Sequence, residues 1–199
     1  MTMIELPPRP SPNAATPALV DRGGVMRGAS AIRVNRLGNH YRISITYPPL
    51  DDEDRARVFV SRLIRAKRMG LRMPYPLLGV DQGRCGWGVV VDGGGQAGDK
   101  LKVRGLPRGG VVREGFWMSI EDASGQHYLH NVGAEVMADA AGKATLSVAD
   151  TLLRRPFADG CRVHIARPMI EGVIDGDELS WELAIDHNTG ISFVLEEAA

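Results

Sequence analysis

The 199-residue chain has few cysteines and no net charge, and each shortage excludes a class of protein. Two cysteines, Cys85 and Cys161, are too few for a disulfide framework and favour a reducing compartment during synthesis. The sequence leaves open whether these two residues pair. The 24 basic and 24 acidic residues cancel, so the phosphate-driven, non-specific binding of nucleic acid is not expected.

Long apolar runs are also missing. No stretch of about 18 apolar residues occurs, so no membrane-spanning helix is expected. The first residues, MTMIELPPRPSPNAATP, contain no apolar core of a signal peptide, so export by the general secretory route is not expected. Apolar residues still make up 44% of the chain, which is enough for a buried core.

Glycine and proline are plentiful, with 24 and 12 residues, and they cluster in short turns. From about Leu77 a short apolar run is followed by such a turn every 8–12 residues. The runs are WGVVVD, DKLKVRGL, GFWMSIED, QHYLHNVG, KATLSV and CRVHIAR. This spacing predicts a small all-β barrel or sandwich.

The N-terminal part differs from this pattern. Prolines at positions 7, 8, 10, 12 and 17 predict an extended segment that does not pair regularly in a sheet, either a disordered tail or an arm along a neighbouring subunit. The following stretch, AIRVNRLGNHYRISITYPPL, alternates between apolar and polar residues. It predicts two strands joined at Gly38-Asn39, the second ended by Pro48-Pro49.

One helix is predicted, from Asp51 to Gly70. Asp51 or Asp52 can cap its start, acidic residues fill its first turn, basic residues fill its last turn, and Gly70 suits its end. Its apolar stripe, formed by Ala56, Phe59, Val60, Leu63 and Ala66, is expected to lie on a sheet. Its charged face is either solvated or turned to a neighbouring subunit, in which case Arg62, Arg65 and Arg68 are the interface candidates.

The C-terminal segment LSWELAIDHNTGISFVLEEAA predicts a β-hairpin, with its turn at 186–190. Two N-terminal strands are too few for a stable sheet, and this hairpin would complete it. We therefore predict a Pro-rich arm at 1–20, a first domain formed by 21–77 and 175–199, and an inserted β module at 78–174. The fold class is mainly β with one α-helix.

Two histidines, His127 and His130, stand three positions apart in SGQHYLHNVG. The flanking residues predict a strand, on which such residues point to opposite faces, so one ion is not expected to bind both. Tyr128 with His130, or His127 with Leu129, would then face inward. The glycine run 93–98 precedes a strand rather than a helix, so we interpret it as a hairpin tip and not a phosphate loop.

Other chemically active residues lack the partners that a catalytic site needs. Ser119 and Ser192 lie inside predicted strands rather than in nucleophile elbows, and no base can be assigned to Cys85. The acidic stretches 121–122 and 175–178 lack the spacing of a calcium loop and are interpreted as surface turns. No enzyme, metal or cofactor is predicted.

The middle and C-terminal parts resemble the tail proteins of long-tailed, siphovirus-type bacteriophages. A first pattern is matched by Gly105-Leu106, Gly115, Ile120 and Tyr128-Leu129-His130-Asn131-Val132. A second pattern is matched by Asp139-Ala140, Gly142, Ala144-Thr145-Leu146, Val148, Leu153-Arg154, Gly160, Val163 and Pro168, and the terminal GISFVLEE follows. Glu114-Gly115-Phe116 departs from the Gly-Asp of the pattern. The resemblance covers about half of the chain, and the order of its pieces carries it.

Among such proteins the chain is most similar to distal tail proteins, which join the tail tube to the tip or baseplate hub. The resemblance implies a tail-tube-like domain with one helix, an outer β domain that is often galectin-like, and a hexameric ring in the virion made in the bacterial cytoplasm. It implies tail tube, tail hub and tape-measure proteins as partners, with DNA passing through the ring and no sequence-specific nucleic-acid binding. A tail-tube protein is the nearest alternative.

Two further hypotheses belong to other classes. A carbohydrate-binding module would use Trp87, Trp117 or Tyr128 as platforms on which host glycans stack. A metal-dependent hydrolase would use His127, His130 or His164.

Overall fold

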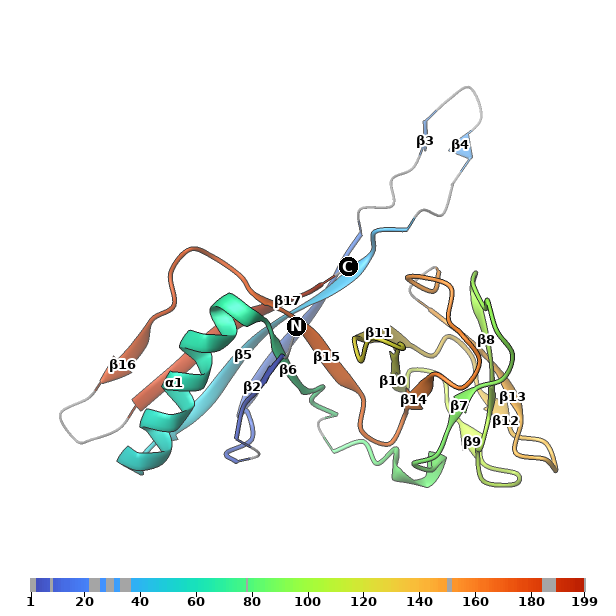
Figure 1. Cartoon of the computed structure of the whole chain (residues 1–199), viewed down its shortest axis with the longest axis horizontal. Helices are drawn as coiled ribbons and strands as arrows, with labels where there is room; N and C mark the ends of the chain where they lie inside the picture. Colours follow the sequence, from blue (N-terminus) through green and yellow to red (C-terminus); the bar gives the residue numbers. More distant parts are fainter. Residues whose placement is uncertain are drawn as a thin grey trace. The chain divides into compact units, whose positions relative to one another are not determined.

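The computed structural model describes residues 3–7, 9–21, 26–27, 31–32, 37–77, 79–149, 152–183 and 189–198. These residues form a mainly β structure with a single α-helix, as predicted (Figure 1). No helix among them is long and apolar enough to cross a membrane.

The chain divides into two compact units, each with its own sheet. The first unit consists of Met1–Ala18, Tyr41–Pro76 and Glu171–Ala198, and the second contains Leu19–His40 and Leu77–Ile170. The first unit is therefore discontinuous, and it is interrupted near the expected boundaries at 77 and 175. The segment 19–40, most of which is predicted to belong to the first domain, groups with the second unit.

The first unit is built on a seven-stranded sheet. Its order is β1-β6-β15-β17-β5-β2, with β16 also paired to β17. The strands are β1 (Ile4–Glu5), β2 (Ala14–Val20), β5 (His40–Leu50), β6 (Leu71–Pro74), β15 (Met169–Ile174), β16 (Trp181–Leu183) and β17 (Thr189–Glu197). The C-terminal strand β17 lies between β15 and β5, so the end of the chain completes the sheet, as the sequence predicted.

Helix α1 (Glu53–Met69) begins and ends where its sequence signals stand. Asp52 caps it, because its Oδ1 accepts a hydrogen bond from the Arg55 backbone N–H at 3.1 Å. Gly70 ends it with a φ of 85°, a conformation that favours glycine, and donates its N–H to the Ala66 carbonyl. Four residues of the predicted stripe are buried, namely Ala56, Phe59, Leu63 and Ala66.

The stripe of α1 packs on the first unit's sheet. The Phe59 ring meets the edge of Tyr47 of β5, with centroids 4.7 Å apart and planes at 69°. Tyr47 in turn stacks against Phe193 of β17, with centroids 6.2 Å apart. At the end of α1, Lys67 Nζ donates to the carbonyls of Ile174 and Gly176 and so ties the helix to the chain after β15.

Two predictions about proline are wrong. Pro48-Pro49 does not end its strand, because β5 continues to Leu50 through a bulge, where the register with β17 shifts between Thr189 and Ile191. The Pro-rich segment was not expected to pair, yet β2 contains Pro17 and pairs with β5. Because β2 lies at the edge of the sheet, Pro17 can lack an N–H donor without breaking an inner ladder.

The second unit contains a six-stranded sheet of order β11-β10-β14-β7-β8-β13. These strands are β7 (Val90–Val91), β8 (Lys100–Arg104), β10 (Trp117–Glu121), β11 (His127–Asn131), β13 (Ala144–Ser147) and β14 (Arg162–His164). Each of the six predicted apolar runs contains one of them. Shorter pairs are β9 (Val111–Val112) with β12 (Val136–Met137) and β3 (Met26–Arg27) with β4 (Ala31–Ile32).

The core of the second unit is continuous and apolar. Its largest fully buried members are Leu101, Met118, Ile120, Leu146, Leu153, Phe157 and Ile165. Tyr128 of β11 contributes an edge contact to Phe157, with ring centroids 5.6 Å apart. The strand predicted before Gly38-Asn39 and the hairpin turn predicted at 186–190 fall largely outside the described residues.

Candidate functional site

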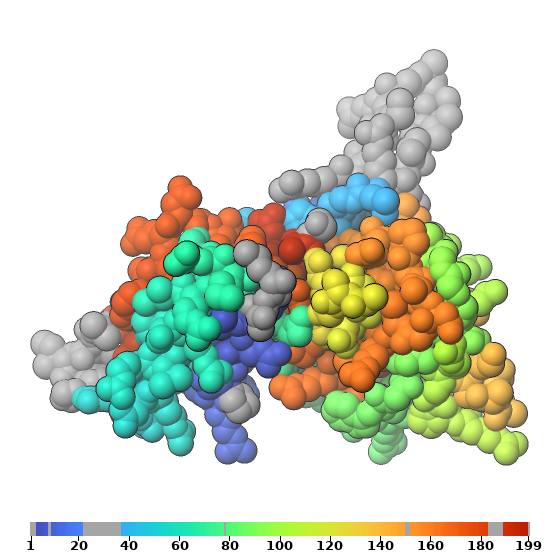
Figure 2. All heavy atoms as spheres, viewed as in Figure 1, coloured from blue at the N-terminus to red at the C-terminus, as the bar shows by residue number. Residues whose placement is uncertain are grey.

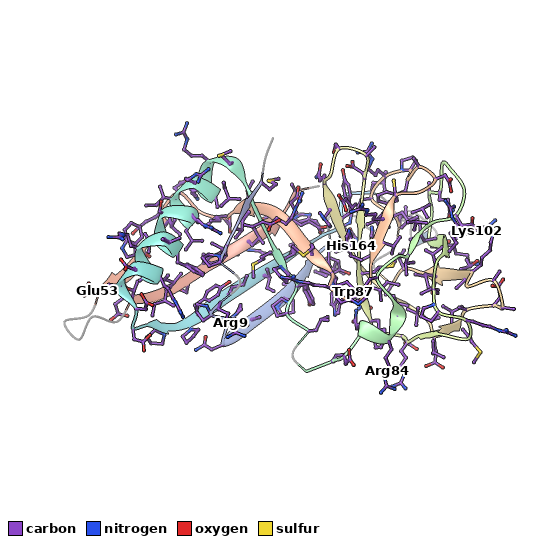
Figure 3. The ribbon with its side chains drawn as sticks, turned by 60° about the horizontal axis from the view of Figure 1, so that its bottom comes forward. Arg9, Glu53, Arg84, Trp87, Lys102 and His164 are labelled. Atoms are coloured by element: carbon purple, nitrogen blue, oxygen red, sulfur yellow. The ribbon has the colours of Figure 1, made fainter. Side chains whose placement is uncertain are left out.

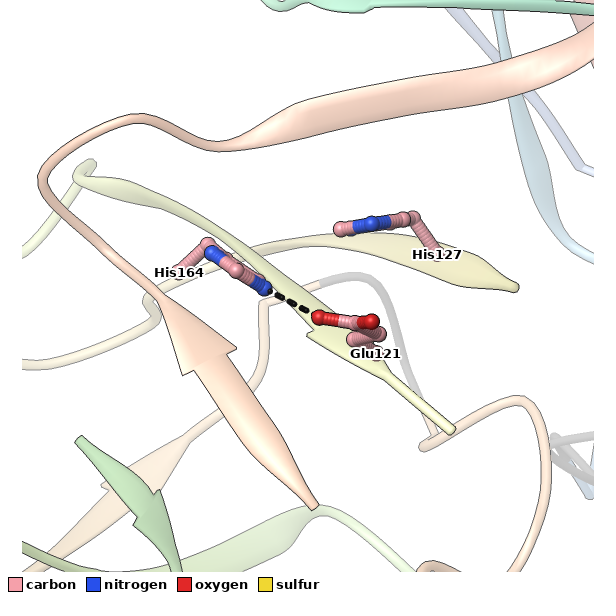
Figure 4. Close-up of side chains that lie close together, drawn as sticks. All are labelled: Glu121, His127 and His164. Atoms are coloured by element: carbon pink, nitrogen blue, oxygen red, sulfur yellow. Dashed lines mark hydrogen bonds and ion pairs between the residues drawn. The ribbon is translucent and has the colours of Figure 1, made fainter. Parts of the chain in front are cut away.

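Three neighbouring strands of the second unit bring Glu121, His127 and His164 together. The strands lie in the order β11-β10-β14. Glu121 of β10 pairs directly with His127 of β11, and His164 of β14 pairs with Ser119, two residues before Glu121 on β10. Because side chains alternate along a strand, all three side chains rise from the same face of the sheet. Figure 4 shows them on that face.

The contacts within this cluster are close. His164 Nε2 lies 2.9 Å from Glu121 Oε2, at hydrogen-bond distance (Figure 4). The rings of His127 and His164 have centroids 4.9 Å apart with planes tilted by 43°. His127 Nδ1 lies 3.3 Å from Ser119 Oγ, which also accepts the backbone N–H of Met169 at 2.9 Å. One ligand atom from each of Glu121, His127 and His164 lies within 4.8 Å of the others.

Burial and charge act in opposite directions on Glu121. Desolvation is the largest influence and raises the pKa of this carboxyl. The hydrogen bond from His164 and the positive charges of His127, His164 and Arg162 outweigh it, so the pKa of Glu121 falls below its ordinary value. His127 is buried, whereas the side chains of Glu121 and His164 keep 26% and 30% of their exposure. Solvent therefore reaches one side of the cluster.

The proximity of a serine, a histidine and a carboxylate resembles a hydrolytic triad only in composition. A nucleophilic serine must be open to its substrate and bonded to the base. Ser119 is completely buried in β10, and its Oγ already accepts the Met169 N–H. The geometry of these residues suits ion binding and strand cross-linking better than acyl transfer.

The two histidines of β11 face opposite sides, as predicted. His130 pairs with Met118, a member of the apolar core, while His127 pairs with Glu121. Two inward faces of this strand are predicted, one with Tyr128 and His130 and one with His127 and Leu129. Tyr128 belongs to the apolar core, so the face with Tyr128 and His130 is turned toward that core. From the sequence, His164 was a candidate only as one of three alternative histidines of a metal-dependent hydrolase, and Glu121 was not assigned to that site. The register of a hairpin between the neighbouring predicted strands 115–122 and 126–133 would have placed Glu121 beside His127. His164 comes from a distant segment of the sequence, so no such local signal marks it.

The three arginines proposed for a subunit interface have different surroundings on α1. Arg62 is partly buried, and its Nη1 donates to the Glu5 carbonyl at 2.9 Å within the first unit. Arg65 and Arg68 are exposed. Val58 and Ile64 are 44% and 48% exposed, and their helical spacing places them opposite the buried stripe of α1, whose surface is coloured teal in Figure 2. We call Val58, Ile64, Arg65 and Arg68 the outer face of α1.

The two tryptophans proposed to stack on glycans also differ. Trp87 follows the short 3-10 helix η1 (Gly83–Cys85) and is 77% exposed (Figure 3). Trp117, the first residue of β10, is half-buried, and its backbone is held in both directions by the side chain of Gln82. Trp87 is therefore the better platform.

The other candidate residues have structural partners. Cys85 and Cys161 are buried, free thiols, and burial together with Asp81 raises the pKa of Cys85. The glycine run 93–98 joins the antiparallel strands β7 and β8, as predicted for a hairpin tip. Of the acidic turns, Asp122 accepts hydrogen bonds from Ser124, Gln126 and Arg155, and Asp175 pairs with Arg42.

The first unit contains a surface pocket. Its volume is about 400 Å³, and its lining includes Arg9, Ser11, Pro49, Asp51 and Arg55. Charges of both signs line it, and it gathers no catalytic set of residues.

No protein-family model matches the sequence, and no curated protein matches it either.

Proposed function

We propose that the protein is a structural, non-enzymatic subunit of a phage tail, a distal tail protein whose copies form a hexameric ring between the tail tube and the tip. One observation carries the proposal. The first unit is split around an all-β unit, contains one helix, and is completed by the C-terminal strand β17. The resemblance of residues 105–168 and the C-terminus to siphovirus tail proteins implies a β domain with one helix and a second β domain, and this division of the chain supports the proposal.

The outer face of α1 supplies a suitable contact for ring assembly. Closed rings need two different, complementary surfaces on each subunit. Val58 and Ile64 expose apolar area beside the cationic Arg65 and Arg68, a combination of apolar and arginine side chains that is common at interfaces. The absence of net charge on the chain lowers the repulsion between identical subunits.

Charge reversal on the outer face of α1 tests this interface. The double variant Arg65→Glu/Arg68→Glu should shift the purified protein from the ring to the monomer in native mass spectrometry. The matched control is Arg84→Glu/Arg108→Glu, which reverses two exposed arginines of the second unit and should leave the ring intact. Equal oligomerisation of both variants would refute the assignment of the interface to α1.

The proposal places the protein in the virion tail, in contact with tail tube, tail hub and tape-measure proteins, with DNA passing through the ring. A tail-tube protein is the nearest alternative. Labelling of intact tails with an antibody against the chain separates the two roles. A single labelled position at the tail tip supports the distal tail role, and labelling along the whole tail supports the tube.

A second candidate function rests on Trp87, whose 77% exposure is unusual for so large an apolar ring. On that hypothesis the second unit binds surface glycans of the host. A glycan array should then give signals that Trp87→Ala abolishes. Trp181→Ala, which removes an exposed tryptophan of the first unit, should retain them. An array without signals would eliminate this function.

A further inference from the structure

We propose that Glu121, His127 and His164 form a binding site for a divalent transition-metal ion, with Zn²⁺ as the preferred ion. Among the residues that the structure describes, they form the one group of three or more potential ligands whose donor atoms converge. The site is independent of ring assembly and of glycan binding.

The donor set suits zinc chemically. Two imidazoles and one carboxylate form a borderline ligand set, which favours zinc and its neighbours over the harder magnesium and calcium ions. Three protein ligands leave a fourth tetrahedral position for water. The partial exposure of Glu121 and His164 provides a path for the ion and that water.

The distances require only a small rearrangement. Ligand atoms bound to one tetrahedral zinc ion at about 2.0–2.1 Å are themselves ~3.3 Å apart. His164 Nε2 and Glu121 Oε2 are 2.9 Å apart, and one ligand atom from each of the three residues lies within 4.8 Å of the others. A shift of about 1–1.5 Å in a carboxylate and a ring closes the difference. Such a shift is within reach of the two partly exposed side chains.

A supporting hydrogen bond for His127 is already in place. Metal-binding histidines commonly donate their second ring N–H to a fixed acceptor, which sets the tautomer. Ser119 Oγ lies 3.3 Å from His127 Nδ1 and is itself fixed by the N–H of Met169. With Nδ1–H donated to Ser119, Nε2 is the nitrogen that we assign to the ion.

The strand arrangement gives the ion a structural role. The three ligands come from β11, β10 and β14, three consecutive strands in the order of the six-stranded sheet. An ion bound by all three residues would cross-link these three strands. Binding only the folded chain, it would stabilise the second unit by mass action.

Isothermal titration with ZnCl₂ tests the site on the untagged, full-length chain, because a histidine tag would itself bind zinc. We expect one ion per chain. Affinity should fall as the pH is lowered, because protonated imidazoles do not bind metal. Glu121→Gln and His164→Gln should each weaken zinc binding more than ~10-fold. Removal of a hydrogen-bond partner of a metal ligand already costs about that much affinity, and removal of the ligand itself should cost at least as much. Glu114→Gln, which neutralises an exposed acidic residue of the same unit, should leave the zinc affinity unchanged.

Two further readouts separate loss of the site from loss of the fold. Circular dichroism should show that the variants keep the native spectrum, and zinc should raise the melting temperature of the wild type but not that of the variants. Co²⁺ should give the strong visible absorption of a tetrahedral site, and excess Mg²⁺ should not displace it. Failure of the wild type to bind zinc at micromolar concentrations would overturn the proposal, as would variants that bind zinc as tightly as the wild type.

Discussion

Replacement of Phe59 by alanine should destabilise the first unit selectively. Phe59 is only 1% exposed, and it joins α1 to the sheet through its edge contact with Tyr47. Truncation of a buried phenylalanine costs about 3–5 kcal/mol, from lost apolar transfer and the cavity that remains. The cavity here would be bounded by a sheet strand that cannot collapse freely. We therefore expect a loss of about 4 kcal/mol in the free energy of unfolding.

Hydrogen exchange read by mass spectrometry can assign this loss to one unit. In Phe59→Ala, the backbone amides of peptides covering β5 and β17 should exchange faster, by the factor that corresponds to the loss of unfolding free energy. Peptides covering β10 and β14 should be nearly unchanged, because their core is separate. Val58→Ala, one residue away on the exposed side of α1, should change stability by about 0.5 kcal/mol or less. A loss below about 1 kcal/mol for Phe59→Ala, or equal acceleration in both units, would refute the reasoning.

Three other predictions concern ionic and thiol groups. Arg72→Met should lower the free energy of unfolding, measured with denaturant, by about 3 kcal/mol, because it removes the guanidinium that lies 2.7 Å from the Glu171 carboxylate, which is 2% exposed. The double variant Arg72→Met/Glu171→Leu should recover most of that loss. A double variant as unstable as the single one would contradict this prediction. Arg104 lowers the pKa of Asp159 to about 2, so Asp159 stabilises the fold above its unfolded pKa of 3.8, and this stabilisation is lost as pH falls toward 2. The melting temperature of Arg104→Gln should therefore depend on pH less steeply than that of the wild type between pH 2 and 5. Identical pH profiles of the two proteins would count against this prediction. Cys85 and Cys161 should react with a thiol reagent only after denaturation, and rapid labelling of the native chain would be inconsistent with their burial.

The sequence predicted the local elements well where several signals agreed. Helix α1 starts two residues after Asp51 and ends one residue before Gly70, because the cap, the apolar stripe and the glycine all mark the same segment. Each apolar run of the second unit became a strand because its turns were marked by glycine. The prediction failed at Pro48-Pro49, since proline ends a regular ladder but fits a bulge, and no local pattern marks a bulge.

The Glu121, His127 and His164 cluster could be predicted only in part. Glu121 and His127 belong to one hairpin, and its register follows from two neighbouring runs. His164 joins them because β14 lies beside β10, a pairing between segments about 40 residues apart that depends on the strand order of the whole sheet. His130 shares the strand of His127 but faces the other side, whereas Glu121 of β10 and His164 of β14 lie beside His127.

Electron microscopy of the purified, full-length chain tests most directly whether it is a ring subunit. Negatively stained particles should be closed rings with six-fold symmetry and a central opening, and the particle size should correspond to six chains. A monomer at tens of micromolar concentration, with no closed rings and no incorporation into tails, would contradict the account.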